Sequence, residues 1–155
     1  MVDFLYNTGS ARLWDTLQPT DLIVDTVKVM LVTSSYVADR DNDFIEEGVN
    51  DANEHEITGT GYVAGFAGAG RLTLASKTIT VDKANDRTEF DCADLTWTSI
   101  DAGTPSQMLV IVEITNDLAS PLIGHVDSGG FPVTTNGGDL TVTINAEGLI
   151  QLSTA

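Results

Sequence analysis

The chain has 155 residues, of which 42% are hydrophobic and 19% charged, and its 23 acidic against 7 basic residues give a formal net charge of −16. Its length suits one domain, and its composition is that of a globular protein rather than a disordered one. The charge argues against direct binding to nucleic acid or to anionic membranes, because both depend on clustered basic residues. We therefore expect a single β domain over residues 1–155, with residues 1–25 as an N-terminal arm and short helix.

The N-terminal segment carries a helical pattern. Leu13, Trp14 and Leu17 stand at helical spacing before Pro19, which predicts a short amphipathic helix over residues 10–17. Trp14 either covers the open end of a sheet, which is the simpler interpretation, or contacts a partner.

The rest of the chain alternates between strand patterns and turns. In the segment Gln107–Thr115, five of the six residues after Gln107 are apolar, which predicts a central strand buried on both faces. The sequence Asn136-Gly137-Gly138 is the strongest hairpin signal. Further strands are expected over residues 26–33, 71–81, 88–98, 121–127, 140–144 and 149–152. This pattern predicts an all-β fold, an antiparallel β-sandwich or jelly-roll-like barrel with one short N-terminal helix.

Two segments superficially resemble ligand-binding loops. Residues 39–50 carry carboxylates at alternate positions, but Phe44 stands where a calcium loop needs glycine, and Asn50 where it needs glutamate. The glycines of residues 64–70 are followed by Arg71 and a strand rather than by a lysine and a helix, as a phosphate-binding loop requires. We expect a solvated acidic loop or helical turn in the first segment and a bend or a loop under close backbone approach in the second, with no metal and no cofactor.

The sequence offers little for catalysis. The two histidines, His55 and His125, and the single Cys92 lie outside recognised nucleophile and zinc motifs. A lone cysteine cannot form an intramolecular disulfide. The first residues also lack a signal-peptide pattern, and no apolar run approaches the roughly 20 residues of a membrane span. We expect a non-enzymatic protein that is made in the cytoplasm and has no membrane partner.

Several short motifs nevertheless form a recognisable order along the chain. They are Tyr6-Asn-x-Gly9, Asp25 to Tyr36, Asp41-x-Asp43-Phe44, Glu56-Ile-Thr-Gly-Thr-Gly-Tyr62, Asp94-Leu-Thr-Trp97, Ser120-Pro-Leu-Ile-Gly124, Val133 to Asp139 and Ala146 to Ile150. In this order the sequence resembles a family of small virion proteins of tailed bacteriophages, over nearly its whole length. The resemblance implies a structural component of the particle and carries over no catalytic residue. The glycine-rich residues 64–70 depart from the family pattern.

Two functions are compatible with this resemblance. One is a head decoration, or cement, protein that binds the major capsid protein on the outer capsid surface, as a homotrimer. The other is a tail or tail-fibre component that binds a receptor or carbohydrate. The absence of a repeat or heptad pattern favours decoration, and the acidic charge suits an outer surface better than one facing DNA. Phe4, Leu5, Tyr6 and Trp14 are the predicted contacts with the capsid or with other subunits.

Overall fold

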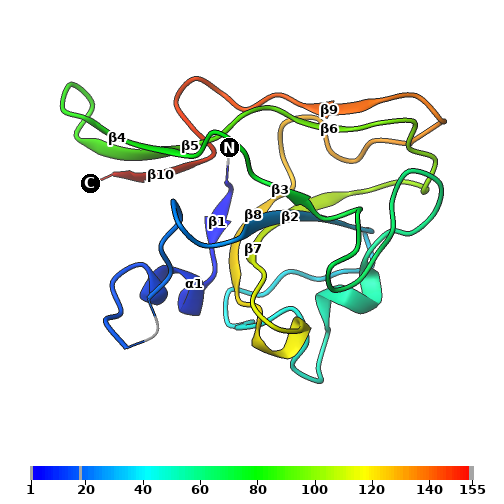
Figure 1. The fold of residues 1–155 in the computed structure, drawn as a ribbon, viewed down its shortest axis with the longest axis horizontal. Helices are drawn as coiled ribbons and strands as arrows, with labels where there is room; N and C mark the ends of the chain where they lie inside the picture. Colours follow the sequence, from blue (N-terminus) through cyan, green and yellow to red (C-terminus); the bar gives the residue numbers. More distant parts are fainter. Residues whose placement is uncertain (1, 18, 154–155) are drawn as a thin grey trace.

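The structure is a computed structural model that describes residues 2–17 and 19–153, and it is built mostly of antiparallel β-sheet (Figure 1). A five-stranded sheet has the order β1-β8-β7-β2-β3, a three-stranded sheet the order β10-β5-β4, and a two-stranded sheet pairs β6 with β9. The strands are β1 (Phe4–Leu5), β2 (Val27–Val32), β3 (Leu72–Thr73), β4 (Thr78–Asp82), β5 (Arg87–Asp91), β6 (Leu95–Trp97), β7 (Gln107–Val112), β8 (Leu122–Val126), β9 (Leu140–Val142) and β10 (Ile150–Ser153). The expectation of an all-β antiparallel fold with one short helix is confirmed, and the described residues form no closed barrel.

The predicted central strand lies in the middle of the largest sheet. β7 pairs with β2 on one side and β8 on the other, both antiparallel. Residues Met108 to Val112 are all buried. A strand with covered faces on both sides needs apolar residues at successive positions, which explains its unbroken apolar run. The strand ends at Val112, so the predicted extension to Thr115 is wrong, and Glu113 lies where the chain leaves the sheet.

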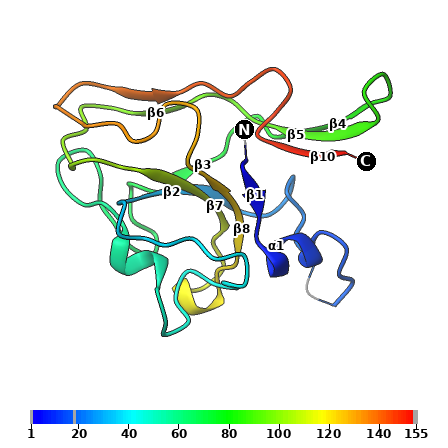
Figure 2. The same cartoon turned by 180° about the vertical axis from the view of Figure 1, so that it is seen from behind.

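Each face of the five-stranded sheet packs on a separate apolar cluster. One cluster joins β2, β7 and β8 to side chains of the two smaller sheets, including Phe90, Leu95, Trp97 and Ile150. The other lies on the opposite face, where Met30 and Leu109 pack against residues from the N-terminal segment and the loop after β2. Two 3₁₀ turns span Ala52–His55 and Asp117–Ala119. Figure 2 shows β6 and β9 above the five-stranded sheet, and the loop after β2 and the two 3₁₀ turns below it. The central sheet therefore separates two layers of packing.

The N-terminal helix differs from the prediction. α1 spans Asn7–Arg12 rather than residues 10–17, and the chain turns away at Leu13. The reason is tertiary: a Cβ on Gly9 would lie 2.4 Å from the backbone oxygen of Leu122, so the helix begins where glycine allows close approach to β8. Gly9 is accordingly the one buried residue of the helix.

The N-terminal arm is an integral part of the sheet. β1 pairs antiparallel with β8, and the backbone N–H of Val2 donates to the carbonyl of Leu149 at 2.9 Å. Tyr6 is fully buried, and its hydroxyl lies 3.0 Å from that of Tyr36. The first described residues, from Val2 to Tyr6, are therefore joined to the rest of the chain by strand pairing and by hydrogen bonds.

Candidate functional site

The most enclosed polar cluster surrounds Arg71. Its guanidinium donates to both carboxylate oxygens of Glu56, at 3.0 and 2.7 Å, and to both oxygens of Asp117, at 2.6 and 3.1 Å. Glu56 also accepts the hydroxyl of Tyr62 at 2.9 Å. The network extends to Glu113, which pairs with Lys28. It links the loop after β2, the glycine-rich bend and the loop after β7.

The Arg71 cluster is closed to solvent and its charges are paired. Burial lowers the pKa of Arg71, but its hydrogen bonds with Glu56 and Asp117 outweigh that effect and raise the pKa above its ordinary value. The side chains of Arg71 and Glu56 are 0% and 1% exposed, so a substrate cannot reach them. Four charge-assisted hydrogen bonds satisfy the guanidinium almost completely, as buried charges require.

The glycine-rich residues 64–70 form a bend around Tyr62. A Cβ on Gly70 would lie 2.3 Å from the Tyr62 ring, and the carbonyl of Gly70 accepts the indole N–H of Trp97 at 2.7 Å. The backbone N–H of Gly65 donates to Glu56 at 2.9 Å. Packing on the Tyr62 ring explains Gly70, close approach to backbone carbonyls of residues 63–65 explains Gly68, and a positive φ of 91° explains Gly65, in line with the predicted bend.

The acidic residues 39–51 form a loop in which carboxylates stabilise turns. Asp39 accepts the backbone N–H of Asp41 at 3.0 Å, and Asp51 accepts those of Glu47 and Gly48 at 2.8 and 2.7 Å. Such side chain to backbone bonds are typical of turn-forming aspartates. Asp41 and Asp43 instead accept hydrogen bonds from the side chains of Asn7 and Thr8 in α1, so the loop is also tied to the N-terminal helix.

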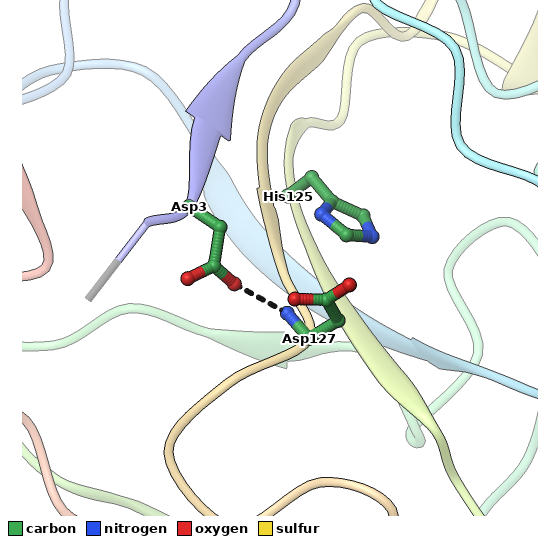
Figure 3. Close-up of side chains that lie close together, drawn as sticks. All are labelled: Asp3, His125 and Asp127. Carbon is green, nitrogen blue, oxygen red and sulfur yellow. Dashed lines mark hydrogen bonds between the residues drawn. The ribbon is translucent and has the colours of Figure 1, made fainter.

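A second polar cluster, Asp3, His125 and Asp127, lies where β1 meets the end of β8 (Figure 3). Each side chain offers one potential metal ligand, and these atoms all lie within 4.8 Å of one another. Within residues 2–17 and 19–153, this is the one group of three His, Cys, Asp or Glu side chains with that spacing. Sequence analysis missed it because Asp3 and Asp127 are 124 residues apart.

The protonation of this cluster follows from its surroundings. Burial lowers the pKa of His125, although the carboxylates of Asp127 and Asp3 oppose the shift, so burial favours the neutral imidazole. Burial raises the pKa of Asp3, but hydrogen bonds from Ser128 and Asp127 outweigh it and hold the pKa below 3.8. These surroundings favour an ionised Asp3 beside a neutral, buried imidazole.

An apolar groove lies between the small sheet and the chain after α1. Figures 1 and 2 show the sheet β10-β5-β4 projecting at one end of the molecule, above α1. The groove has a volume of about 450 Å³. Its lining is mainly apolar and consists of Leu13, Trp14, Pro19, Thr20, Asp21, Leu22, Ile79, Thr88, Phe90, Ile150 and Leu152.

The strand register explains why this face of the small sheet is apolar. Ile79 on β4 and Ile150 on β10 both stand opposite Phe90 on β5, so the three side chains form one row across the sheet. Glu89 and Gln151 are directly paired on the opposite face. The sheet is therefore apolar toward the groove and polar away from it.

The four predicted contact residues are placed differently from one another. Phe4 and Leu5 are half-buried in β1, and Tyr6 is fully buried, so its ring is not presented at the surface. Trp14 lines the groove and is 78% exposed, and the neighbouring Leu17 is 90% exposed. The interpretation of Trp14 as a plug over the core is therefore wrong. Of the four, Trp14 is the side chain most available to a partner.

The described residues contain no helix that is long and apolar enough to cross a membrane. Comparison of the chain with protein-family models, with curated proteins and with solved structures gives no match.

Proposed function

We propose that this protein is a non-enzymatic structural component of a tailed-bacteriophage virion, a head decoration protein that binds the outer surface of the capsid as a homotrimer. The ordered motifs along the sequence support the class of protein. The apolar groove beside Trp14 carries the proposal for how it attaches. We also class the fold as a β-sandwich, because one apolar cluster lies between the five-stranded sheet and the smaller sheets.

The groove fits a protein partner because apolar side chains gather there on an otherwise acidic chain. Trp14 and Ile79, which line the groove, are 78% and 52% exposed in the isolated chain. Aromatic and aliphatic side chains of this kind act as anchors when an interface covers them. The partner would be the major capsid protein, and contacts from three linked subunits would raise the avidity well above that of one groove.

The charge supports a position outside the head. With a net charge of −16, the protein would be repelled by packaged DNA and would keep particles apart in solution. Of its seven basic residues, Lys28 and Arg71 are held in the buried network. Few cations are then left for contact with phosphate.

The decisive experiment adds purified protein to phage heads that lack it. Wild-type protein should bind the heads, should raise the temperature at which they rupture, and should be visible on the head surface by electron microscopy. Trp14→Ser and Ile79→Thr should reduce occupancy without changing the melting temperature of the free protein. Ile114→Thr is the matched control, because Ile114 is 50% exposed, against 52% for Ile79, and lies outside this groove.

Three other results would count against the proposal. Binding to tails in place of heads would support the alternative, a tail or tail-fibre component. If the Ile79→Thr and Ile114→Thr variants occupy heads equally, the groove is not part of the interface with the capsid. If the protein sediments as a monomer, both free in solution and after release from heads, the proposed homotrimer is wrong.

A further inference from the structure

We propose that Asp3, His125 and Asp127 form a binding site for a divalent transition-metal ion of the Zn²⁺ type, with Nδ1 of His125 as the nitrogen ligand. The inference is independent of the proposed role in the virion. It rests on an imidazole nitrogen that is buried without a partner, on two adjacent carboxylates, and on the residue that orients the imidazole.

The orientation of the imidazole follows from Gln107. The side-chain amide nitrogen of Gln107 donates to the carbonyl of Tyr36 at 2.8 Å, so its amide oxygen is the atom that lies 2.8 Å from Nε2 of His125. An amide oxygen accepts only, and Nε2 must therefore carry the proton. In the neutral ring this leaves the lone pair on Nδ1.

Nδ1 is available as a ligand. It is buried, and it has no hydrogen-bond partner in the structure, while His125 as a whole is only 3% exposed. A buried acceptor without a partner is unfavourable. Phe4 stacks on the imidazole, with ring centroids 4.6 Å apart, and this contact fixes the plane of the ring. A histidine that donates its other N–H to an oxygen is the usual arrangement at a metal centre.

The two carboxylates supply oxygen ligands and negative charge. Asp3 accepts the backbone N–H of Asp127 at 2.5 Å and both the N–H and the hydroxyl of Ser128, at 3.1 and 2.6 Å. These bonds use three of the roughly four acceptor positions of a carboxylate. In Figure 3 the Asp127 carboxylate lies beneath the imidazole, and Asp3 approaches from β1. Among the residues described, no ion pair engages either aspartate.

The ligand set selects the class of ion. One imidazole nitrogen and two carboxylate oxygens suit Zn²⁺ and related ions, with water in the remaining position. Ca²⁺ and Mg²⁺ prefer all-oxygen sites. Asp3 and Asp127 are exposed residues, so an ion can enter from solvent. Small side-chain shifts would bring atoms that lie within 4.8 Å to a shared ion.

The test uses the full chain without an affinity tag, stripped of metal by a chelator and titrated with ZnCl₂ by calorimetry and thermal unfolding. We expect one Zn²⁺ per chain and a higher melting temperature. CoCl₂ should give the absorption bands of a low-coordinate Co²⁺ site. His125→Asn and Asp127→Asn should abolish both effects, and Gln107→Leu should weaken binding by about 10- to 100-fold, as expected for loss of an orienting partner.

The controls are the chain's other histidine and an exposed aspartate elsewhere. His55→Asn and Asp101→Asn should bind Zn²⁺ like the wild type. If His125→Asn does not fold, the Asp127→Asn variant provides the test, because the side chain of Asp127 is exposed and its replacement should not prevent folding. An affinity weaker than about 100 μM, Zn²⁺ binding that survives Asp127→Asn, or a stronger response to CaCl₂ than to ZnCl₂ would each overturn the proposal.

Discussion

Arg71 and Glu56 form a bidentate ion pair from which solvent is excluded, although 15 residues separate them in the sequence. Replacing Arg71 with methionine keeps much of the side-chain volume but leaves the carboxylates of Glu56 and Asp117 buried without their cation. We expect Arg71→Met to lower the free energy of unfolding by about 3–5 kcal/mol, measured by urea denaturation. Arg87→Met is the control, because Arg87 pairs with acids near the surface. Equal losses in the free energy of unfolding of the two variants would show that the buried network stabilises the fold no more than a surface ion pair does.

Gly9→Ala should destabilise the protein, although alanine favours helices. In an exposed helix this change stabilises by about 1 kcal/mol. Here the new Cβ would meet the Leu122 carbonyl oxygen at 2.4 Å and Cα of Ile123 at 2.8 Å, so α1 must move away from β8. The melting temperature of Gly9→Ala should be compared with that of Ser10→Ala, a control substitution in the same helix. A Gly9→Ala variant as stable as wild type would mean that α1 does not dock as described.

The two tryptophans should report opposite environments. Trp14 is 78% exposed, whereas Trp97 is buried and bonded to Gly70. Acrylamide should quench the Trp14 emission readily, and Trp14→Phe should leave a blue-shifted emission that is poorly quenched. The free energy of unfolding of this variant should lie within about 0.5 kcal/mol of the wild-type value, as is usual for substitutions of exposed residues. Strong quenching of the remaining emission would contradict the burial of Trp97.

Stability should fall at alkaline pH partly through Cys92. Burial, with smaller contributions from Asp91 and Asp94, raises the pKa of the Cys92 thiol from 9.0 to about 11. Between these two values the unfolded chain releases the thiol proton while the folded chain retains it, so the unfolded state becomes more favourable as pH rises. The free energy of unfolding should decrease from pH 9 toward pH 11, and less steeply in Cys92→Ala.

The wild-type and Cys92→Ala curves must be compared at each pH because other groups act in the same direction. Burial also raises the pKa of Tyr6, Tyr36 and Tyr62. Their effect is common to both proteins and cancels in the difference. Parallel curves for the two proteins would mean that the thiol ionises equally in the folded and unfolded states.

Strands with continuous apolar runs were predictable from the sequence, and their partners were not. β2 and β7 lie within the segments expected from their composition, because burial on both faces leaves a local signal. The turn at residues 136–138 was expected to close a hairpin, yet β9 pairs with β6 instead. The chain before this turn bonds to residues 103–105, through Val133 and Thr135. Pairing between distant segments leaves no mark in local periodicity.

The candidate sites likewise combine residues that the sequence indicates with residues that only the fold brings together. Trp14 was singled out from the sequence, but the other side of its groove comes from β4, β5 and β10, which no local pattern connects to it. The predicted strand over residues 71–81 is divided between β3 and β4, which belong to different sheets. The cluster of Asp3 and His125 depends on the pairing of β1 with β8 and could not be inferred from spacing. Side chains that act together here are assembled by long-range contacts.

The pairing of β1 with β8 also bears on how the protein is made. Phe4 pairs with His125 and Leu5 with Gly124, and Val2 bonds to Leu149. During translation β1 therefore emerges long before its partners, and its pairing must wait until most of the chain has left the ribosome. Contacts this distant in sequence close large loops and slow folding. Within the five-stranded sheet, β8 and the edge strand β1 that pairs with it should be the last to join. A nascent chain stalled before residue 122 should therefore be a suitable substrate for chaperones.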